Sequence, residues 1–290
     1  MSGAATSVIR KAVLPVAGLG TRLLPITKEL PKEMLPIFLR GADGGLCAKP
    51  MIQAVFEQLH DTGLREFCFV VGREKRAIED HFTSDEGYLK RLSRKDNKGR
   101  LQDLQQFYRR ILTSSIVWIN QPEPRGFGDA VLKAEPFVGG DRFLCHAGDT
   151  HIVSKGNRHL AKLLGLSEEE GCGAVFVAQR VKSPRAYGVL EGERISDRVY
   201  DVRRVMEKPK RPRSNIAIMP LYVFRPIIFK ALKRTGRGFG GEFQLTDAIQ
   251  RLIDWKSRVY AYLLGSEDLR LDIGTPETWW EALAVSHSRS

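Results

Sequence analysis

Short apolar runs of strand length alternate with helical patterns through the first half of this chain. The run EFCFVV at residues 66–71, for example, follows a helical stretch that starts at Pro50 and ends at Gly63, as helices often do. Strand after helix after strand predicts an α/β fold with a central, mostly parallel sheet flanked by helices. In such sheets ligands bind at the carboxyl ends of the strands. The expected strands lie at 11–17, 66–71, 115–119 and 142–146, and the expected helices at 50–63, 74–82 and 128–135.

The second half of the chain is richer in strand-like sequence than the first. The expected strands lie at 173–180, 187–190, 198–207, 217–224 and 258–263, and the expected helices at 226–234, 244–255 and 276–286. We expect the whole chain, residues 1–290, to form one domain, because a single large core can be built at this length. Its two halves would be residues 8–150 and residues 151–290.

A charged segment, residues 85–114, interrupts the alternation and is expected to be a helical insertion with two halves around Asn97. Its basic run is typical of a solvated helical arm. A nucleic-acid-binding patch would need more aromatic side chains among its cations than Tyr88, Phe107 and Tyr108. We therefore expect no nucleic-acid partner for this segment.

Composition restricts the possible partners and the compartment. The net charge of +12 favours anionic partners, such as phosphorylated metabolites, nucleic acid or anionic lipid, or else a solvated, ion-paired surface. The four cysteines form no C-x-x-C or zinc pattern, which fits a reducing cytoplasm. The N-terminus is a poor signal peptide, and no run approaches the roughly 20 apolar residues of a membrane span. We therefore expect a cytoplasmic protein with no membrane partner.

The loop AGLGTRLLPITKELPKEMLP, residues 17–36, follows the first expected strand. It contains G-x-G but lacks the third glycine of the dinucleotide-binding fingerprint, and it is not a P-loop. Its glycines still allow backbone N–H groups to approach a phosphate, and Arg22 and Lys32 are cations suited to phosphate oxygens. Taken by itself, the loop could be a cofactor cradle, a phosphate clamp or plain surface.

Read at full length, LPVAGLGTRLLPITKELPKEMLPI resembles the signature of the sugar-nucleotide pyrophosphorylases. The resemblance is strongest to the bacterial-type UTP–glucose-1-phosphate uridylyltransferases of that family, which also carry a long helical segment after DHF. It continues in order along nearly the whole chain. The matching segments are KPMIQ, REKRAIEDHF, QPEPRGFGDAV, GDT, YGV, MEKP, SNIAI and GEFQLTDAI.

The resemblance implies a Rossmann-like nucleotidyltransferase fold with a β-rich sugar-binding half. The implied reaction makes UDP-glucose and pyrophosphate from UTP and glucose 1-phosphate, with Mg²⁺ as cofactor and a homodimer or homotetramer as the assembly. LDIGTPE, residues 271–277, is closer to the thymidylyl or guanylyl branches. The alternative is therefore a glucose-1-phosphate thymidylyltransferase, which makes dTDP-glucose, or an enzyme that accepts both UTP and dTTP.

The resemblance also assigns the charged residues of the site. Asp149 and Asp272 would hold Mg²⁺, although Thr150 stands where the family usually has a second Asp. Arg22 and Lys32 would hold the triphosphate, and Lys208 the sugar phosphate. No general base is needed, because a sugar-phosphate oxygen is already anionic at neutral pH, so catalysis would come from positioning and charge neutralisation.

The remaining assignments concern the base and the sugar. The backbone at Ala17, Gly18 and Gly20 would wrap the nucleotide, and Gly126 would leave room for the base. Glu33 and Gln121 would meet the uracil edge. Glu207 would bind sugar hydroxyls, and Gly188, Asn215 and Glu242 would also face the sugar. Other interpretations stay open for some of them. Glu207 and Lys208 could form a strand-edge ion pair, and Asn215 could be a turn residue. Trp279 and Trp280 are expected to pack, or to form an oligomer contact.

Overall fold

The computed structural model describes residues 9–93 and 98–289, and one nine-stranded sheet of order β5-β4-β1-β6-β11-β8-β12-β10-β9 runs through both halves of the chain. Seven of these strands run in one direction, and only β11 and β10 are reversed within the described residues. The prediction of a mostly parallel sheet is therefore confirmed. The strands are β1 (Lys11–Pro15), β4 (Glu66–Val71), β5 (Ser115–Asn120), β6 (Phe143–His146), β8 (Cys172–Arg180), β9 (Gly188–Ser196), β10 (Val199–Glu207), β11 (Ile216–Phe224) and β12 (Arg258–Leu263).

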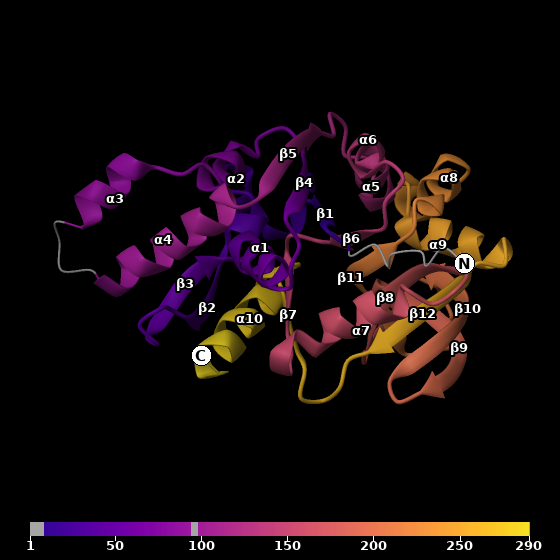
Figure 1. Cartoon of the computed structure of the whole chain (residues 1–290). Helices are drawn as coiled ribbons and strands as arrows, with labels where there is room; N and C mark the ends of the chain where they lie inside the picture. The colour runs from indigo at the N-terminus through magenta and orange to yellow at the C-terminus, as the bar shows by residue number, and fades with distance from the viewer. Residues whose placement is uncertain (1–8, 94–97, 290) are drawn as a thin grey trace, which may run out of the picture.

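Helices flank this sheet, as the alternation predicts (Figure 1). The helix α1 is buried at every residue from Met51 to His60, which explains why its sequence is apolar on more than one face. The helices are α1 (Met51–Asp61), α2 (Arg76–His81), α3 (Glu86–Leu92), α4 (Lys98–Leu112), α5 (Phe127–Lys133), α6 (Glu135–Val138), α7 (Arg158–Leu166), α8 (Ile227–Lys233), α9 (Leu245–Asp254) and α10 (Pro276–Arg289).

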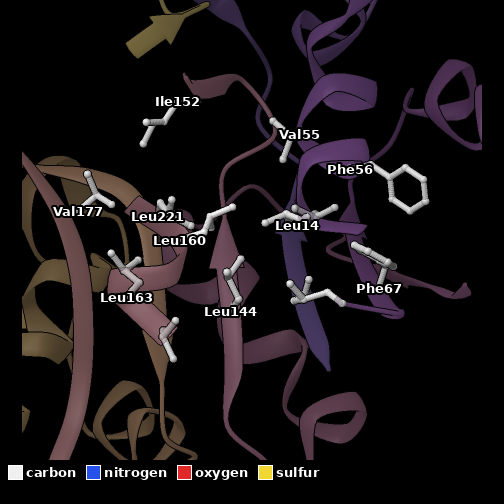
Figure 2. Close-up of a cluster of buried hydrophobic side chains, with 14 of the residues drawn as sticks. Leu14, Val55, Phe56, Phe67, Leu144, Ile152, Leu160, Leu163, Val177 and Leu221 are labelled. Atoms are coloured by element: carbon white, nitrogen blue, oxygen red, sulfur yellow. The ribbon is translucent and has the colours of Figure 1, made fainter. Parts of the chain in front are cut away.

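The hydrophobic core covers both faces of the sheet, because side chains alternate along each strand. Leu14 of β1 and Leu144 of β6 belong to the cluster that α1 and α7 cover, and Figure 2 shows them between Val55 and Leu163. Val13 points to the opposite face, into a cluster that includes α5, α8 and α9. Strands buried on both faces read as continuous apolar runs, which is why the central strands stand out in the sequence.

Two short antiparallel sheets lie outside the main one. In the first, β2 (Pro36–Arg40) pairs with β3 (Leu46–Pro50), and residues 41–45 connect the two strands as a hairpin. In the second, β7 (Thr150–Val153) pairs with β13 (Leu269–Asp272), with Asp272 opposite Thr150. The second sheet joins two segments that lie more than a hundred residues apart in sequence.

The charged insertion consists of α3 and α4, which extend to one side of the molecule (Figure 1). Its predicted helical character is confirmed, but residues 94–97 between the helices lie outside the described part of the chain. The expectation of a fully solvated arm is wrong for α4. Phe107 is completely buried, and its ring stacks on His81 with centroids 4.9 Å apart.

The four cysteines are free and buried. Among residues 9–93 and 98–289, no helix is long and apolar enough to cross a membrane. Residues 1–8, to which the expectation about a signal peptide partly refers, lie outside the described residues.

His159 provides a test of the core at α7. It is fully buried beside Ser154 Oγ, which lies 2.6 Å from its Nδ1, and burial lowers the pKa of His159 to about 3. In the unfolded chain the His159 side chain binds a proton as pH falls through about 6.5, whereas in the folded chain it stays neutral. Proton binding therefore stabilises the unfolded state, and the free energy of unfolding decreases as pH falls below about 6.5. Urea denaturation should show that His159→Leu loses about 2 kcal/mol less stability than wild type between pH 7.5 and pH 5. His287→Leu, which changes an exposed histidine, is the control, and an equal loss in wild type and His159→Leu would contradict the prediction.

Candidate active site

The pairing of β7 with β13 brings Asp149 and Asp272 together. The backbone carbonyl of Asp149 accepts a hydrogen bond of 2.9 Å from Ile273 N, which ties the two turns to each other. Thr150 Oγ1 lies 3.3 Å from Asp272 Oδ1 and 3.5 Å from Asp149 Oδ1. The hydroxyl that replaces the family's second Asp therefore bridges the two carboxylates predicted to hold the metal.

The loop that begins at Ala17 closes over these turns. Lys32 Nζ forms an ion pair with Asp149 Oδ2, and Gly18 lies against the end of the Lys32 side chain. Arg22 comes from the first short helix of the loop, η1 (Thr21–Leu23), and reaches the turn after β13, where a methyl group on Gly274 would lie 3.7 Å from its Nη2. The structure thus brings the two predicted phosphate-binding cations to the two predicted metal ligands.

The ionisation states of these groups follow from burial and charge. Burial opposes ionisation of Asp149, but the Lys32 ammonium outweighs it and holds the pKa of Asp149 below its usual value. Burial and the neighbouring Asp149 raise the pKa of Asp272, although Arg270 Nη1 lies 3.5 Å from its Oδ2. Burial also opposes the charge on Lys32, yet Asp149 and Glu33 raise the pKa of Lys32 overall. Lys32 therefore stays protonated at neutral pH.

Gly148 holds the turn before Asp149 close to the core. A methyl group at this position would lie 2.5 Å from Val16 Cγ1 and 2.9 Å from Ile52 Cδ1, closer than side-chain carbons can pack. Only glycine lets the turn after β6 pass this close to Val16, which follows β1, and to Ile52 of α1. The GDT motif therefore needs glycine at position 148 for packing.

Glu33 is not placed as the sequence suggested. It is 2% exposed, and its Oε2 lies 3.0 Å from Nζ of Lys75, which is also buried. Burial raises the pKa of Glu33, while Lys75 and Lys32 favour its charged form. Its position in the interior does not support the expected contact with the uracil edge, and Glu33 instead buttresses the loop that carries Lys32.

Gln121 directly follows β5 and faces the start of α5. Its Nε2 donates to Asp129 Oδ2 at 2.7 Å and lies 3.3 Å from the carbonyl oxygen of Gly126. Asp129 also accepts from Arg125 at 2.8 Å, so its carboxylate is held in place. Both N–H directions of the Gln121 amide point at protein acceptors, which leaves the amide oxygen as the group available to a ligand.

Glycine is required at position 126 because of a contact within the protein, whereas it was expected there to leave room for the base. Its φ is +115°, and a methyl group there would lie 2.8 Å from Phe243 O and 2.9 Å from Glu242 Cβ. The room that its missing side chain provides is taken by residues 242 and 243 of the protein. Glu242, expected on the sugar side, consequently lies against the predicted nucleotide loop, where its Oε2 accepts from Gln244 at 3.2 Å.

The predicted sugar side is built on paired strands. Gly188 lies opposite Glu207 in the β9–β10 register, and a methyl group on Gly188 would lie 3.0 Å from Glu207 Oε2. Thr246 donates to the same carboxylate oxygen at 2.7 Å. Lys208, whose φ is +40°, lies 3.8 Å from Glu207 Oε1 and 5.0 Å from the centroid of the Phe239 ring. Lys208 therefore sits at the mouth of this cluster, partly neutralised by Glu207.

Asn215 lies at the end of the connection that leads into β11. Its side chain is exposed, and Oδ1 accepts from Arg180 Nη1 at 3.1 Å. Its backbone carbonyl accepts from Val181 N at 3.0 Å. Asn215 thus fastens two neighbouring connections, and only its amide nitrogen is available to a sugar.

Sequence reasoning missed four residues that shape the site, namely Thr150, Lys75, Arg270 and Thr246. Arg270 links the predicted metal site to the sugar side, because its Nε donates to Gln179 at 2.9 Å while its guanidinium lies near Asp272 and over Tyr187. Lys75 and Thr246 lie within motifs that carry the resemblance, and Thr150 and Arg270 lie next to or near the predicted metal ligands. Their closeness in sequence to residues or motifs already assigned to the site is the signal that could have identified them.

Within residues 9–93 and 98–289, no group of three or more His, Cys, Asp or Glu side chains could hold a metal ion. Two carboxylates and a bridging hydroxyl are nevertheless a donor set that Mg²⁺ accepts, since Mg²⁺ is bound through one or two carboxylates and completes its shell with water and substrate phosphate. Burial and the negative charge of Asp149 both raise the pKa of Asp272, and a bound cation would favour its charged form. The residues present fit the predicted magnesium site.

Comparisons with known proteins show which sequences and folds this chain is similar to. A sequence profile of the nucleotidyl transferase family matches residues 11–288. A Staphylococcus epidermidis protein named UTP–glucose-1-phosphate uridylyltransferase is 38% identical over 269 residues, which cover 92% of this chain and 88% of the relative. The crystal structure of a UDP-glucose pyrophosphorylase complexed with UDP-glucose is similar with a TM-score of 0.81 at 30% identity, covering 97% of this chain and all of the other. The UTP-bound UGPase of Acinetobacter baumannii has a TM-score of 0.81 at 28% identity and covers 97% and 94% of the two chains.

The buried pair of Glu33 and Lys75 yields a stability prediction. Lys75→Met would leave the Glu33 carboxylate buried without a cation, so we expect the free energy of unfolding to fall by about 3 kcal/mol, measured by urea denaturation at pH 7.5. Glu33→Gln combined with Lys75→Met should recover much of that loss. Lys28→Met, in an exposed pair whose Nζ lies 3.5 Å from Glu29 Oε1, should cost less than about 1 kcal/mol. Equal stability of Lys75→Met and wild type would contradict the assignment of Glu33 as a buried ion-paired buttress.

Proposed function

The chain belongs to the nucleotidyl transferase family, and we propose that it is a UTP–glucose-1-phosphate uridylyltransferase, making UDP-glucose and pyrophosphate from UTP and glucose 1-phosphate. The observation that carries the proposal is the meeting of Asp149, Asp272 and Lys32 where β7 pairs with β13. Both substrates are polyanions, and this is the place where the protein concentrates metal-binding oxygens and cations. Residues 8–150 would hold the nucleotide and residues 151–290 the sugar phosphate within one domain.

Asp149 and Asp272 would hold Mg²⁺, with the Thr150 hydroxyl between them. When bound, the ion supplies positive charge that offsets the negative charge of the nucleotide phosphates. Lys32 and Arg22 add fixed positive charge on the side of the opening loop, and Gly18 and Gly20 let the backbone approach the nucleotide closely. Because Lys32 is held protonated by Asp149 and Glu33, its charge is present before any substrate arrives.

The reaction forms a bond between a phosphate oxygen of glucose 1-phosphate and the α-phosphorus of UTP. The bond from the α-phosphorus to the β-phosphate oxygen breaks, and pyrophosphate leaves with that electron pair. The nucleophile carries a negative charge at neutral pH, so no side chain has to remove a proton. Lys208 would hold the sugar phosphate, and Glu207, oriented by Thr246, would accept hydrogen bonds from sugar hydroxyls.

The base would be selected by the amide oxygen of Gln121. Asp129 fixes the Gln121 amide so that its oxygen can accept a hydrogen bond from N3–H of uracil. Cytosine has an acceptor at that position and would leave Gln121 without a partner. N3–H is common to uracil and thymine, so this contact alone does not exclude dTTP. Glucose-1-phosphate thymidylyl transfer is therefore the second candidate function, and residues 271–277 are the sequence feature that favours it.

The expected assembly is a homodimer or homotetramer. Trp279 packs into the small core cluster under α10, whereas Trp280 is 71% exposed on the same helix. Trp280 is the side chain that we expect at a subunit contact.

The substrate assignment is tested by measuring pyrophosphate release with UTP, dTTP, GTP, ATP and CTP against a set of sugar 1-phosphates in the presence of Mg²⁺. UTP with glucose 1-phosphate should give the highest kcat/KM. Asp149→Asn and Asp272→Asn should each lower it by at least about 100-fold, while Asp254→Asn, at the end of α9, should leave it unchanged. No release in any pairing would refute the proposal, and a preference for dTTP would replace uridylyl by thymidylyl transfer.

The role of Asp129 predicts a change in base selection. Asp129→Asn places an amide opposite Gln121, so Gln121 can turn over and present its NH₂ group to the base. We expect the ratio of kcat/KM for CTP to that for UTP to rise by about 10-fold. An unchanged ratio in a folded variant, verified by its urea denaturation midpoint, would show that the Gln121 amide does not read the base.

A further inference from the structure

Two connections lie side by side at one end of the main sheet. Residues 181–187 join β8 to β9, and residues 208–215 join β10 to β11. The strand registers place Arg180 opposite Ile216 and Gly188 opposite Glu207. Two backbone hydrogen bonds of 3.0 Å then fasten the connections to each other, from Lys208 N to Tyr187 O and from Val181 N to Asn215 O. The two segments therefore form one continuous edge.

This edge carries positive charge only. The sequences VKSPRAY and KPKRPRSN together contain six Lys or Arg residues and no Asp or Glu. Five of the six cations are exposed, and we call them the basic rim: Lys182, Arg185, Lys210, Arg211 and Arg213. Within residues 9–93 and 98–289, none of these five forms an ion pair, in contrast to Arg194, Arg198 and Arg203 of the adjoining β9–β10 hairpin, each of which has a carboxylate partner.

The basic rim borders the predicted sugar-phosphate site. The sixth cation, Lys208, is the first residue of its connection and follows Glu207 directly, while the other connection ends at Tyr187, next to Gly188. Lys208 is already partly neutralised by Glu207, whose Oε1 lies 3.8 Å from its Nζ. The five cations of the basic rim, which have no carboxylate partner of their own in the described part of the chain, therefore add positive charge along the two connections, one of which begins with Lys208. Like charges held together without counter-ions repel one another, and an approaching anion relieves that repulsion.

We propose that the basic rim captures the anionic sugar 1-phosphate from solution and delivers it to Lys208. The inference rests on the proposed function, since it takes the sugar 1-phosphate as the ligand of that site. Clustered charge of one sign raises the local concentration and the association rate of an oppositely charged ligand, and the effect weakens with salt. The rim touches no reacting atom, so it should change capture of the acceptor and not the chemical step.

The test compares Lys210→Gln/Arg211→Gln/Arg213→Gln with a control that removes three exposed, unpaired cations elsewhere, Lys90→Gln/Arg109→Gln/Lys256→Gln. Lys90 and Arg109 belong to α3 and α4, at the opposite side of the molecule from β9 and β10 (Figure 1). Lys256 precedes β12 at the end where Arg258 pairs with Cys172, opposite to the rim end of β8. The control thus matches the change in net charge without touching the rim.

The measured quantity is kcat/KM for glucose 1-phosphate at saturating UTP, from about 20 mM to about 300 mM NaCl, over which the screening length falls from about 20 Å to about 6 Å. For wild type and control, kcat/KM should fall as salt rises. For the rim variant it should be about 10-fold lower at low salt and nearly independent of salt, with kcat unchanged. Lys182→Gln/Arg185→Gln should change kcat/KM in the same direction, which keeps the test decisive if the triple variant folds poorly.

Equal kcat/KM of the rim variant and the control at low salt would overturn the inference. Titration calorimetry of glucose 1-phosphate, performed on each protein at low and high salt, separates this result from a failure of the proposed function. If wild type shows no turnover with any pair of nucleotide and sugar 1-phosphate, the proposed function fails. The basic rim is then tested by whether the rim variant binds glucose 1-phosphate more weakly than the control does at low salt. Salt-sensitive binding of single-stranded DNA that is lost in the rim variant, with unchanged capture of the sugar phosphate, would assign the rim to nucleic acid and refute the proposal.

Discussion

The pairing of β7 with β13 is the constraint on which the rest of the site depends. Asp149 and Asp272 come from turns 123 positions apart, and neither would have a partner carboxylate without the register that sets Asp272 opposite Thr150. Burial and the neighbouring Asp149 carboxylate both raise the pKa of Asp272, so both oppose a second negative charge at this place. The protein offsets these two effects with Lys32 on one carboxylate and Arg270 near the other. The residues around Asp149 and Asp272 therefore provide the positive charge and the packing that hold these two carboxylates in place.

One small residue and one buried ion pair connect the site to the hydrophobic core. Gly148 lets the turn before Asp149 rest on Val16 and Ile52, so any larger side chain would push the aspartate away from β13. Glu33 and Lys75 form a buried ion pair under the opening loop and fix the backbone next to Lys32. A buried pair of this kind adds little net stability, because desolvation opposes the attraction, but it is costly to break. The loop is therefore held in one position before any substrate binds.

The sequence predicted the long elements well and the short ones poorly. The strand β4 lies where the apolar run 66–71 indicated, because a strand buried on both faces cannot be anything but apolar. The strands β2, β3, β7 and β13 were not predicted, since four or five residues carry too little periodicity of their own, and β7 and β13 also lie more than a hundred residues apart. The helix α7 was not predicted either. The contacts that Glu33 and Gly126 make within the protein were not predicted, for the same physical reason. Their partners, Lys75 and residues 242–243, lie 42 and more than a hundred positions away, and nothing local in the sequence reveals such contacts.

The segment from Phe239 to Phe243 joins the predicted nucleotide side of the molecule to the predicted sugar side. At one end Phe243 N donates to Arg125 O at 2.9 Å and Phe243 O accepts from Gly128 N at 2.9 Å, so the segment is part of the predicted nucleotide loop. At the other end the ring of Phe239 lies 5.0 Å from the ammonium of Lys208. Gln244 Nε2 ties these ends together by donating to Phe239 O at 3.0 Å. A displacement of the predicted nucleotide loop would therefore move the aromatic neighbour of Lys208. In the proposed reaction, which holds two anions at one phosphorus, such a shared backbone segment would let the same atoms position both substrates.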